Sequence, residues 1–161
     1  DSVVLEQFAA AWKLLARGDG PSSIAPFFAG ASLLALPKKD NGLRPIAMGE
    51  ILRRLVGEVL CQDVRQAAQR YFWPCQVGVG SPLGADSAVH TIRQWFQRHL
   101  CDNHRVILKL DFENAFNTVD RADALRQIRE HFPSLSRWAH WCYGQESRLF
   151  FGDLGYWGAA G

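Results

Sequence analysis

The sequence predicts an α/β (α+β) fold that is rich in helices and contains one β-hairpin and a short sheet. Three observations carry this prediction. Apolar residues recur at helical spacing in several long stretches, the turn signal Asp40-Asn41-Gly42 lies between two short apolar runs, and 48% of the 161 residues are hydrophobic against 21% charged. A globular chain of this length buries about 70% of its unfolded surface, so the fold needs neither a disulfide nor a metal.

The N-terminal part of the chain is predicted to form a helix followed by the hairpin. Residues 3–17 place apolar side chains on one helical stripe, and the run Gly18-Asp19-Gly20-Pro21 ends that helix. Residues 31–36 are apolar and strand-like, and residues 44–48 form the return strand. The hairpin therefore carries cations on both arms.

The middle of the chain is predicted to form two helices joined by a glycine-rich loop. From Gly49 to Tyr71 the apolar residues follow the spacing of a long amphipathic helix, which Pro74 stops. The loop over residues 78–84 is not followed by the Lys-Ser/Thr pair of a P-loop, which excludes that kind of phosphate site. A second helix begins at Ala85 and extends to about Leu100.

The C-terminal third is predicted to begin with a buried strand over residues 105–111, which is filled by Val106, Ile107, Leu108 and Leu110. Two helices over residues 121–132 and 134–143, separated at Pro133, follow this strand. A short strand over residues 148–151 comes next, and the glycines after it predict turns.

Charge is distributed unevenly along the chain. Residues 38–109 contain 11 basic and 6 acidic side chains, whereas residues 110–161 contain 5 basic and 7 acidic ones. Most of the cations are Arg, which binds phosphate oxygens and stacks on bases better than Lys does. This distribution favours a phosphate-bearing partner with metal sites in the acidic part, although a mixed, well-solvated surface is the alternative. Candidate nucleic-acid contacts in the basic middle are Arg53, Arg54 and Arg93.

The cysteine and hydropathy patterns predict an intracellular protein that is not secreted and has no membrane partner. The cysteines form no CxxC pair, which is typical of a reducing compartment. His99, Cys101 and His104 lie close in sequence but lack the fourth ligand of a structural zinc site. No apolar run reaches the roughly 18 residues of a membrane span, and the first residues lack the basic leader of a signal peptide.

The segment Lys109-Leu110-Asp111-Phe112-Glu113-Asn114-Ala115-Phe116-Asn117 is the clearest candidate site. Asp111 is expected where the buried strand ends, held rigidly yet open to solvent, which suits a metal ligand in phosphoryl transfer. Phe116 would add a flat aromatic wall beside it. The alternative is that Asp111 caps the next turn and that Phe116 belongs to the core. A calcium loop is excluded, because Phe116 and Ala122 stand where it needs Gly and Glu.

The hairpin segment Pro37-Lys38-Lys39-Asp40-Asn41-Gly42-Leu43-Arg44-Pro45-Ile46 is the second candidate. Strand alternation places one of the two lysines and Arg44 on the same face. Two cations on a mobile hairpin can grip a triphosphate and fold over it. An ordinary charged hairpin is the alternative.

Taken in order, these segments resemble a reverse transcriptase. The order is a PKK-D-x-G-x-RPI hairpin, a long helix, Q-x-G-x-G followed by A-x-x-A-V-H, and K-L-D-F-x-N-A-F-N. It is similar to the polymerase domain of non-LTR retrotransposons and of their group II intron relatives, from about Leu33 to Arg121. The resemblance implies a fingers subdomain with an N-terminal helix over residues 1–104 and the first part of a palm over residues 105–161.

The resemblance also implies a site for the incoming dNTP. Lys38 or Lys39, together with Arg44, would bind the triphosphate. Phe116 would be the steric gate that clashes with a ribose 2′-hydroxyl and so favours deoxyribonucleotides. Template-directed synthesis of DNA would be the reaction.

The catalytic metal and the nucleic acid are implied in the same way. Asp111 would be the first catalytic aspartate of the palm, and Asp111 and Phe112 would hold Mg²⁺ or Mn²⁺ together with further palm carboxylates. The stretch Gln76–Arg93 would lie against the template. The implied partners are an RNA template, a DNA primer and the dNTP, in a nuclear or organellar setting.

Two departures from the family pattern limit this interpretation. Asn117 stands where many relatives have Asp. The Tyr-x-Asp-Asp block and the Gln-Gly-x-Pro-like segment before it do not occur, and by family order they would follow Gly161. We therefore expect a chain that is truncated in mid-palm and inactive alone. The alternatives are a domesticated fragment that serves as a structural or protein-binding subunit, and a nucleic-acid-binding module without catalysis.

Overall fold

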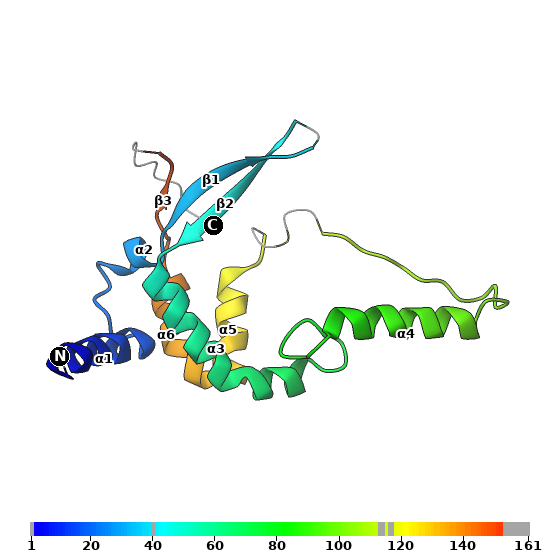
Figure 1. Cartoon of the computed structure of the whole chain (residues 1–161), viewed down its shortest axis with the longest axis horizontal. Helices are drawn as coiled ribbons and strands as arrows, with labels where there is room; N and C mark the ends of the chain where they lie inside the picture. The colour runs from blue at the N-terminus through cyan, green and yellow to red at the C-terminus, as the bar shows by residue number, and fades with distance from the viewer. Residues whose placement is uncertain (1, 40, 113–114, 116–117, 153–161) are drawn as a thin grey trace. The chain divides into compact units, whose positions relative to one another are not determined.

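The structure is a computed structural model that describes residues 2–39, 41–112, 115 and 118–152. Helices and a three-stranded sheet make up a mixed fold, which confirms the α+β prediction (Figure 1). The chain divides into two compact units, one formed by residues 1–62 with 116–161 and the other by residues 63–115. The predicted boundary between residues 104 and 105 stays a prediction. None of the helices in the described part of the chain combines the length and apolar character that a membrane span requires.

The first unit is built mainly from helices. They are α1 (Ser2–Ala16), the short α2 (Ala25–Phe28), the N-terminal part of α3 (Ile51–Phe72), α5 (Arg121–His131) and α6 (Pro133–Tyr143). Asp120 caps α5, because its carboxylate accepts a hydrogen bond of 2.8 Å from the backbone N–H of Asp123. Pro133 lacks the N–H that would continue α5 and instead begins α6, which confirms the predicted break between these helices.

The core of this unit lies among α2, α3 and α6. Its buried residues are Ala25, Ala29, Val56, Trp138, Ala139, Trp141 and Cys142. The indole Nε1 of Trp141 donates a hydrogen bond of 2.7 Å to the carbonyl oxygen of Gly20, and its ring centroid lies 5.3 Å from that of Phe28. Gly18 brings the chain after α1 against the backbone of α6, where a Cβ would lie 2.4 Å from the carbonyl oxygen of Arg137.

The sheet contains the predicted hairpin. Strands β1 (Ala31–Pro37) and β2 (Leu43–Gly49) are antiparallel, with a register that runs from Ala31 opposite Gly49 to Pro37 opposite Leu43. The short β3 (Leu149–Phe150) pairs with β1 in parallel, which gives the strand order β2-β1-β3 (Figure 1). In the turn, Asn41 adopts φ +62°, a left-handed conformation that Asn tolerates better than most residues.

The second unit consists of the C-terminal part of α3, a loop, α4 (Gly84–Arg98) and an extended segment. The loop is tight at Gly80, which has φ +68° and approaches the carbonyl oxygen of Arg65. The helix predicted over residues 85–100 is confirmed as α4. Val89, Ile92 and Phe96 recur on it at helical spacing, and each is about half exposed.

The prediction of a buried strand over residues 105–111 is wrong. The structure assigns no strand to this segment, and Val106 is 85% exposed and Leu108 76%. A strand satisfies its backbone N–H and C=O groups through a neighbouring strand, and no strand of the described chain pairs with this segment. An apolar sequence shows that a segment can be buried, but a buried strand also needs a neighbouring strand from another part of the chain.

Candidate functional site

A hollow at the tip of the β1–β2 hairpin brings together the three cations that the sequence singled out. It has a volume of about 550 Å³, is open to solvent and is lined by Leu36, Pro37, Lys38, Lys39 and Arg44. We call it the hairpin hollow. The lining includes no carboxylate, and Asp40 in the turn lies outside the described residues. The hollow therefore presents cations to any ligand that enters it.

The strand register indicates how these cations are arranged. Leu36 lies directly opposite Arg44, so both residues are on one face of the hairpin. Lys38 is two residues beyond Leu36 and so continues that face, and its backbone N–H donates a hydrogen bond of 2.7 Å to the carbonyl oxygen of Gly42. The sequence leaves the choice between the two lysines open, and the register favours Lys38 as the lysine on the same face as Arg44.

The predicted metal site occupies a different part of the structure. Asp111 is exposed and belongs to the extended segment of the second unit, and Phe112 beside it is 73% exposed. Phe116 and Asn117 lie outside the described residues. Among the residues that are described, no group of three or more His, Cys, Asp or Glu side chains could hold a metal ion. Glu113, the next carboxylate along the chain, lies outside the described residues, so the proposed role of Asp111 as a metal ligand stays a prediction.

The three arginines that were predicted to contact nucleic acid have different surroundings. Arg53 is partly buried, packs against Gly49 and donates from Nη1 to the carbonyl oxygen of Ala29 at 3.2 Å, so it ties α3 to the end of α2. Arg54 is exposed on α3, and Arg93 is exposed on α4 in the second unit. The structure thus gives Arg53 a role within the fold, and the nucleic-acid contacts stay predictions.

One cysteine has a perturbed thiol. Cys142 is fully buried, and burial raises the pKa of its thiol to about 11, although the charge of Arg53 acts in the opposite direction. The thiol is therefore protonated at neutral pH and forms part of the core. The other three cysteines, Cys61, Cys75 and Cys101, are exposed.

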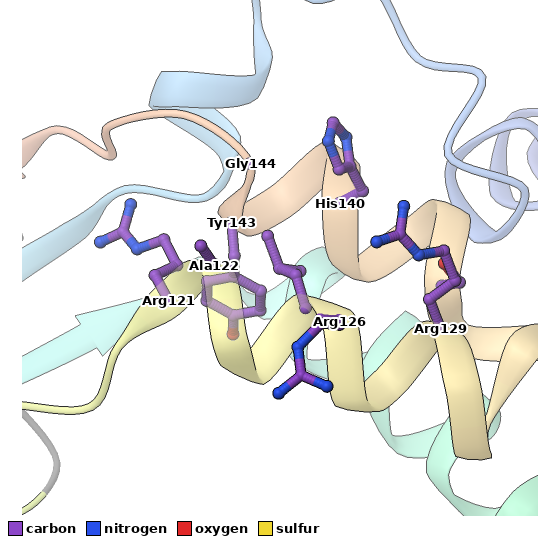
Figure 2. A pocket seen from close by; sticks show the side chains of 9 residues that line it. Arg121, Ala122, Arg126, Arg129, His140, Tyr143 and Gly144 are labelled. Atoms are coloured by element: carbon purple, nitrogen blue, oxygen red, sulfur yellow. The ribbon is translucent and has the colours of Figure 1, made fainter.

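A second hollow lies between α5 and α6 and was missed by the sequence analysis (Figure 2). It has a volume of about 440 Å³ and is lined by Arg121, Ala122, Leu125, Arg126, Arg129, Ser136, His140, Tyr143 and Gly144. We call it the α5–α6 groove. Charge counted along residues 110–161 is slightly acidic and conceals this concentration of arginines. The signal that was available is their helical spacing, because Arg126 and Arg129 are three residues apart and Arg121 and Arg129 are eight residues apart, about two turns.

Comparison with known proteins adds no relative. No protein-family model matches the chain, and neither the curated proteins nor the solved structures contain a match. A function is therefore inferred from the residues of this chain and from their geometry.

Proposed function

We propose that the chain is the fingers region and first palm segment of a reverse-transcriptase-like nucleotidyltransferase, and that its hairpin binds the triphosphate of an incoming dNTP. The observation that carries this proposal is the hairpin hollow, where Lys38, Lys39 and Arg44 line one cavity and no carboxylate belongs to the part of its lining that the structure describes. The same three residues belong to the PKK-D-x-G-x-RPI segment on which the sequence resemblance depends.

The chemistry of these side chains suits a triphosphate. The guanidinium of Arg44 can bind two phosphate oxygens at once, and the lysines add point charges. Because the cations line one small hollow, they act together on a bound anion within the screening length of about 8 Å at physiological salt. Charge at the outer phosphates would also stabilise pyrophosphate as it leaves, when the primer 3′-oxygen bonds to the α-phosphorus and the bond to the β-phosphate oxygen breaks.

The proposed site has three further parts, which are a metal ligand, a gate for the sugar and a surface for nucleic acid. Asp111, with Phe112 next to it, is the proposed ligand of Mg²⁺ or Mn²⁺, together with carboxylates from beyond the described residues. The metal, when bound, would neutralise phosphate charge during transfer. Phe116 is the proposed gate against a ribose 2′-hydroxyl. The basic middle, including Arg54 and Arg93, would follow the backbone of the RNA template and DNA primer.

The proposal is tested by binding to the whole chain in a phosphate series. Deoxyadenosine, dAMP, dADP and dATP would be titrated against the protein by NMR at fixed ionic strength. We expect affinity to rise with each phosphate, by tenfold or more over the series, because each step adds charge for the hollow to bind. Equal affinity for all four ligands would reject triphosphate recognition.

A second candidate function is favoured by the extended segment. Val106, Leu108 and Leu110 are 85%, 76% and 68% exposed, and contiguous exposed apolar surface is typical of protein interaction sites. A structural or protein-binding subunit, without catalysis, is therefore the alternative. It would be preferred if the chain bound neither dATP nor nucleic acid at low salt.

A further inference from the structure

The α5–α6 groove combines three arginines with two aromatic rings. Arg121, Arg126 and Arg129 line it from α5, whereas His140 and Tyr143 line it from α6 (Figure 2). These arginines are three of the five cations in residues 110–161. No acidic side chain belongs to the described lining. The groove is therefore a second cationic surface of the first unit, on elements other than the hairpin.

The spacing of the arginines fits an extended anion better than a single phosphate. Arg121 and Arg129 are eight residues apart on α5, which corresponds to about 12 Å along the helix axis. A nucleic-acid strand advances about 3.4 Å per phosphate when its bases are stacked. The span of α5 from Arg121 to Arg129 thus matches the rise of roughly three to four nucleotides.

The present partners of the arginines allow such a ligand. Arg126 pairs with Asp123 and with Glu130, and the hydrogen bond that its guanidinium donates to the Asp123 carboxylate raises the pKa of Arg126. Both pairs are exposed to solvent, so they contribute little and can exchange for phosphate. Arg121 donates from Nη1 to the carbonyl oxygen of Gln145 at 3.0 Å, which holds its guanidinium near the end of α6. Arg129 forms no ion pair with a described residue.

The α6 side of the groove can contact bases. His140 and Tyr143 are three residues apart, so they are neighbours on one face of the helix, and both are exposed. Exposed rings beside Arg side chains are the arrangement on which unpaired bases stack. The apolar side chain of Leu125 lies between the charged positions along α5. A duplex hides the faces of its bases, so this combination favours a single strand.

We propose that the α5–α6 groove binds a short single-stranded nucleic acid, with Arg121, Arg126 and Arg129 on the phosphates and with Tyr143 and His140 stacked on bases. The site is separate from the hairpin hollow and does not depend on triphosphate recognition there. The α5–α6 groove would thus be a binding site for an unpaired strand of DNA or RNA.

The test is fluorescence anisotropy of the whole chain with a labelled eight-residue oligo-dT, at several salt concentrations. Arg129→Gln is expected to weaken binding about fivefold or more and to reduce the slope of log affinity against log salt by about 0.7, the loss of one phosphate contact. Arg17→Gln, which removes an exposed cation at the end of α1, is the matched control and should leave both quantities unchanged. Equal effects of the two variants would overturn the proposal.

Stacking is tested by a pair of variants at one position. Tyr143→Phe keeps the ring and should bind like the parent, whereas Tyr143→Ala should bind at least fivefold more weakly with an unchanged thermal midpoint. Affinity that survives Tyr143→Ala, or a duplex of the same sequence that binds as tightly as the single strand, would contradict the assignment. If inorganic phosphate at an equal concentration of charge displaced the oligonucleotide completely, the groove would be a general anion site. That result would also contradict the proposal.

Substitutions in the hairpin separate this inference from the proposed function. Lys38→Gln and Arg44→Gln should leave oligo-dT affinity unchanged, and dATP should not displace the oligonucleotide. If the hairpin variants abolished oligo-dT binding while Arg129→Gln did not, the strand would bind at the hairpin and the groove would be excluded.

Discussion

Residues 133–143 and residues 105–112 are both rich in large apolar side chains, yet they differ completely in burial. In α6, Trp138 and Trp141 are each 8% exposed, and Cys142 is 0% exposed. In the extended segment, Val106 is 85% and Leu108 76% exposed. A helix satisfies its own backbone hydrogen bonds and needs only side-chain neighbours, whereas a strand also needs a second strand. The difference shows that an apolar helix can join a core through its side chains alone, whereas an apolar segment that pairs with no described strand stays exposed.

The largest expected effect tests the buried side of this comparison. Trp141→Ala removes the indole from the core together with its hydrogen bond to Gly20, and should lower the free energy of unfolding by about 3–5 kcal/mol. Trp73, which is 57% exposed, is the matched control, and Trp73→Ala should cost less than about 1 kcal/mol. Urea unfolding followed by circular dichroism measures both. Similar costs for the two variants would show that α6 is not the centre of the core.

A pair of valines sharpens the comparison between helix and extended segment. Val56 on α3 is 2% exposed and Val106 is 85% exposed. Val56→Ala should cost about 2 kcal/mol, because it removes buried methyl groups and leaves a cavity. Val106→Ala should change stability by less than about 0.5 kcal/mol. If Val106→Ala were as costly as Val56→Ala, the segment would be buried in solution and the comparison would fail.

A smaller effect is expected from the ionisation of Cys142. Because burial raises the pKa of this thiol to about 11, the folded state favours the protonated form. Its contribution to stability is therefore complete below the ordinary thiol pKa of about 9 and is lost as the pH rises towards 11. The parent chain should lose more stability over this interval than Cys142→Ala, in which the group is absent. Parallel pH profiles of the two proteins would show that the thiol does not titrate from the core.

The sequence predicted the local features of the first unit well, because they depend on nearby residues. The turn residues between Pro37 and Leu43 led to the hairpin, and Pro133 separated the last two helices. Whether residues 105–111 form a buried strand could not be predicted from local patterning, because a buried strand needs a neighbouring strand from a distant part of the sequence. The same limit applies to Arg53, whose partner Ala29 lies 24 residues away in sequence.

The candidate site was predictable to a similar degree. The grouping of Lys38 and Arg44 follows from strand alternation and a short turn, both of which the sequence contains. The α5–α6 groove was not predicted, because the net charge of residues 110–161 sums basic and acidic side chains from all faces of a helix and so hides a basic face. The helical repeat is enough to place Arg121 and Arg129 on one face of α5. That His140 and Tyr143 of α6 line the same groove depends on how the two helices pack, which the sequence pattern does not contain.

The hairpin hollow is the centre of this account, and removal of its paired cations tests it most directly. The measurement is the dissociation constant of dATP for the parent chain, for the double variant Lys38→Gln/Arg44→Gln, and for the control Lys13→Gln/Arg17→Gln. The control removes the same charge from exposed positions on and after α1. We predict that the hairpin variant binds dATP at least tenfold more weakly and that the control binds like the parent. Equal weakening in both variants, or in neither, would contradict the assignment of the triphosphate site.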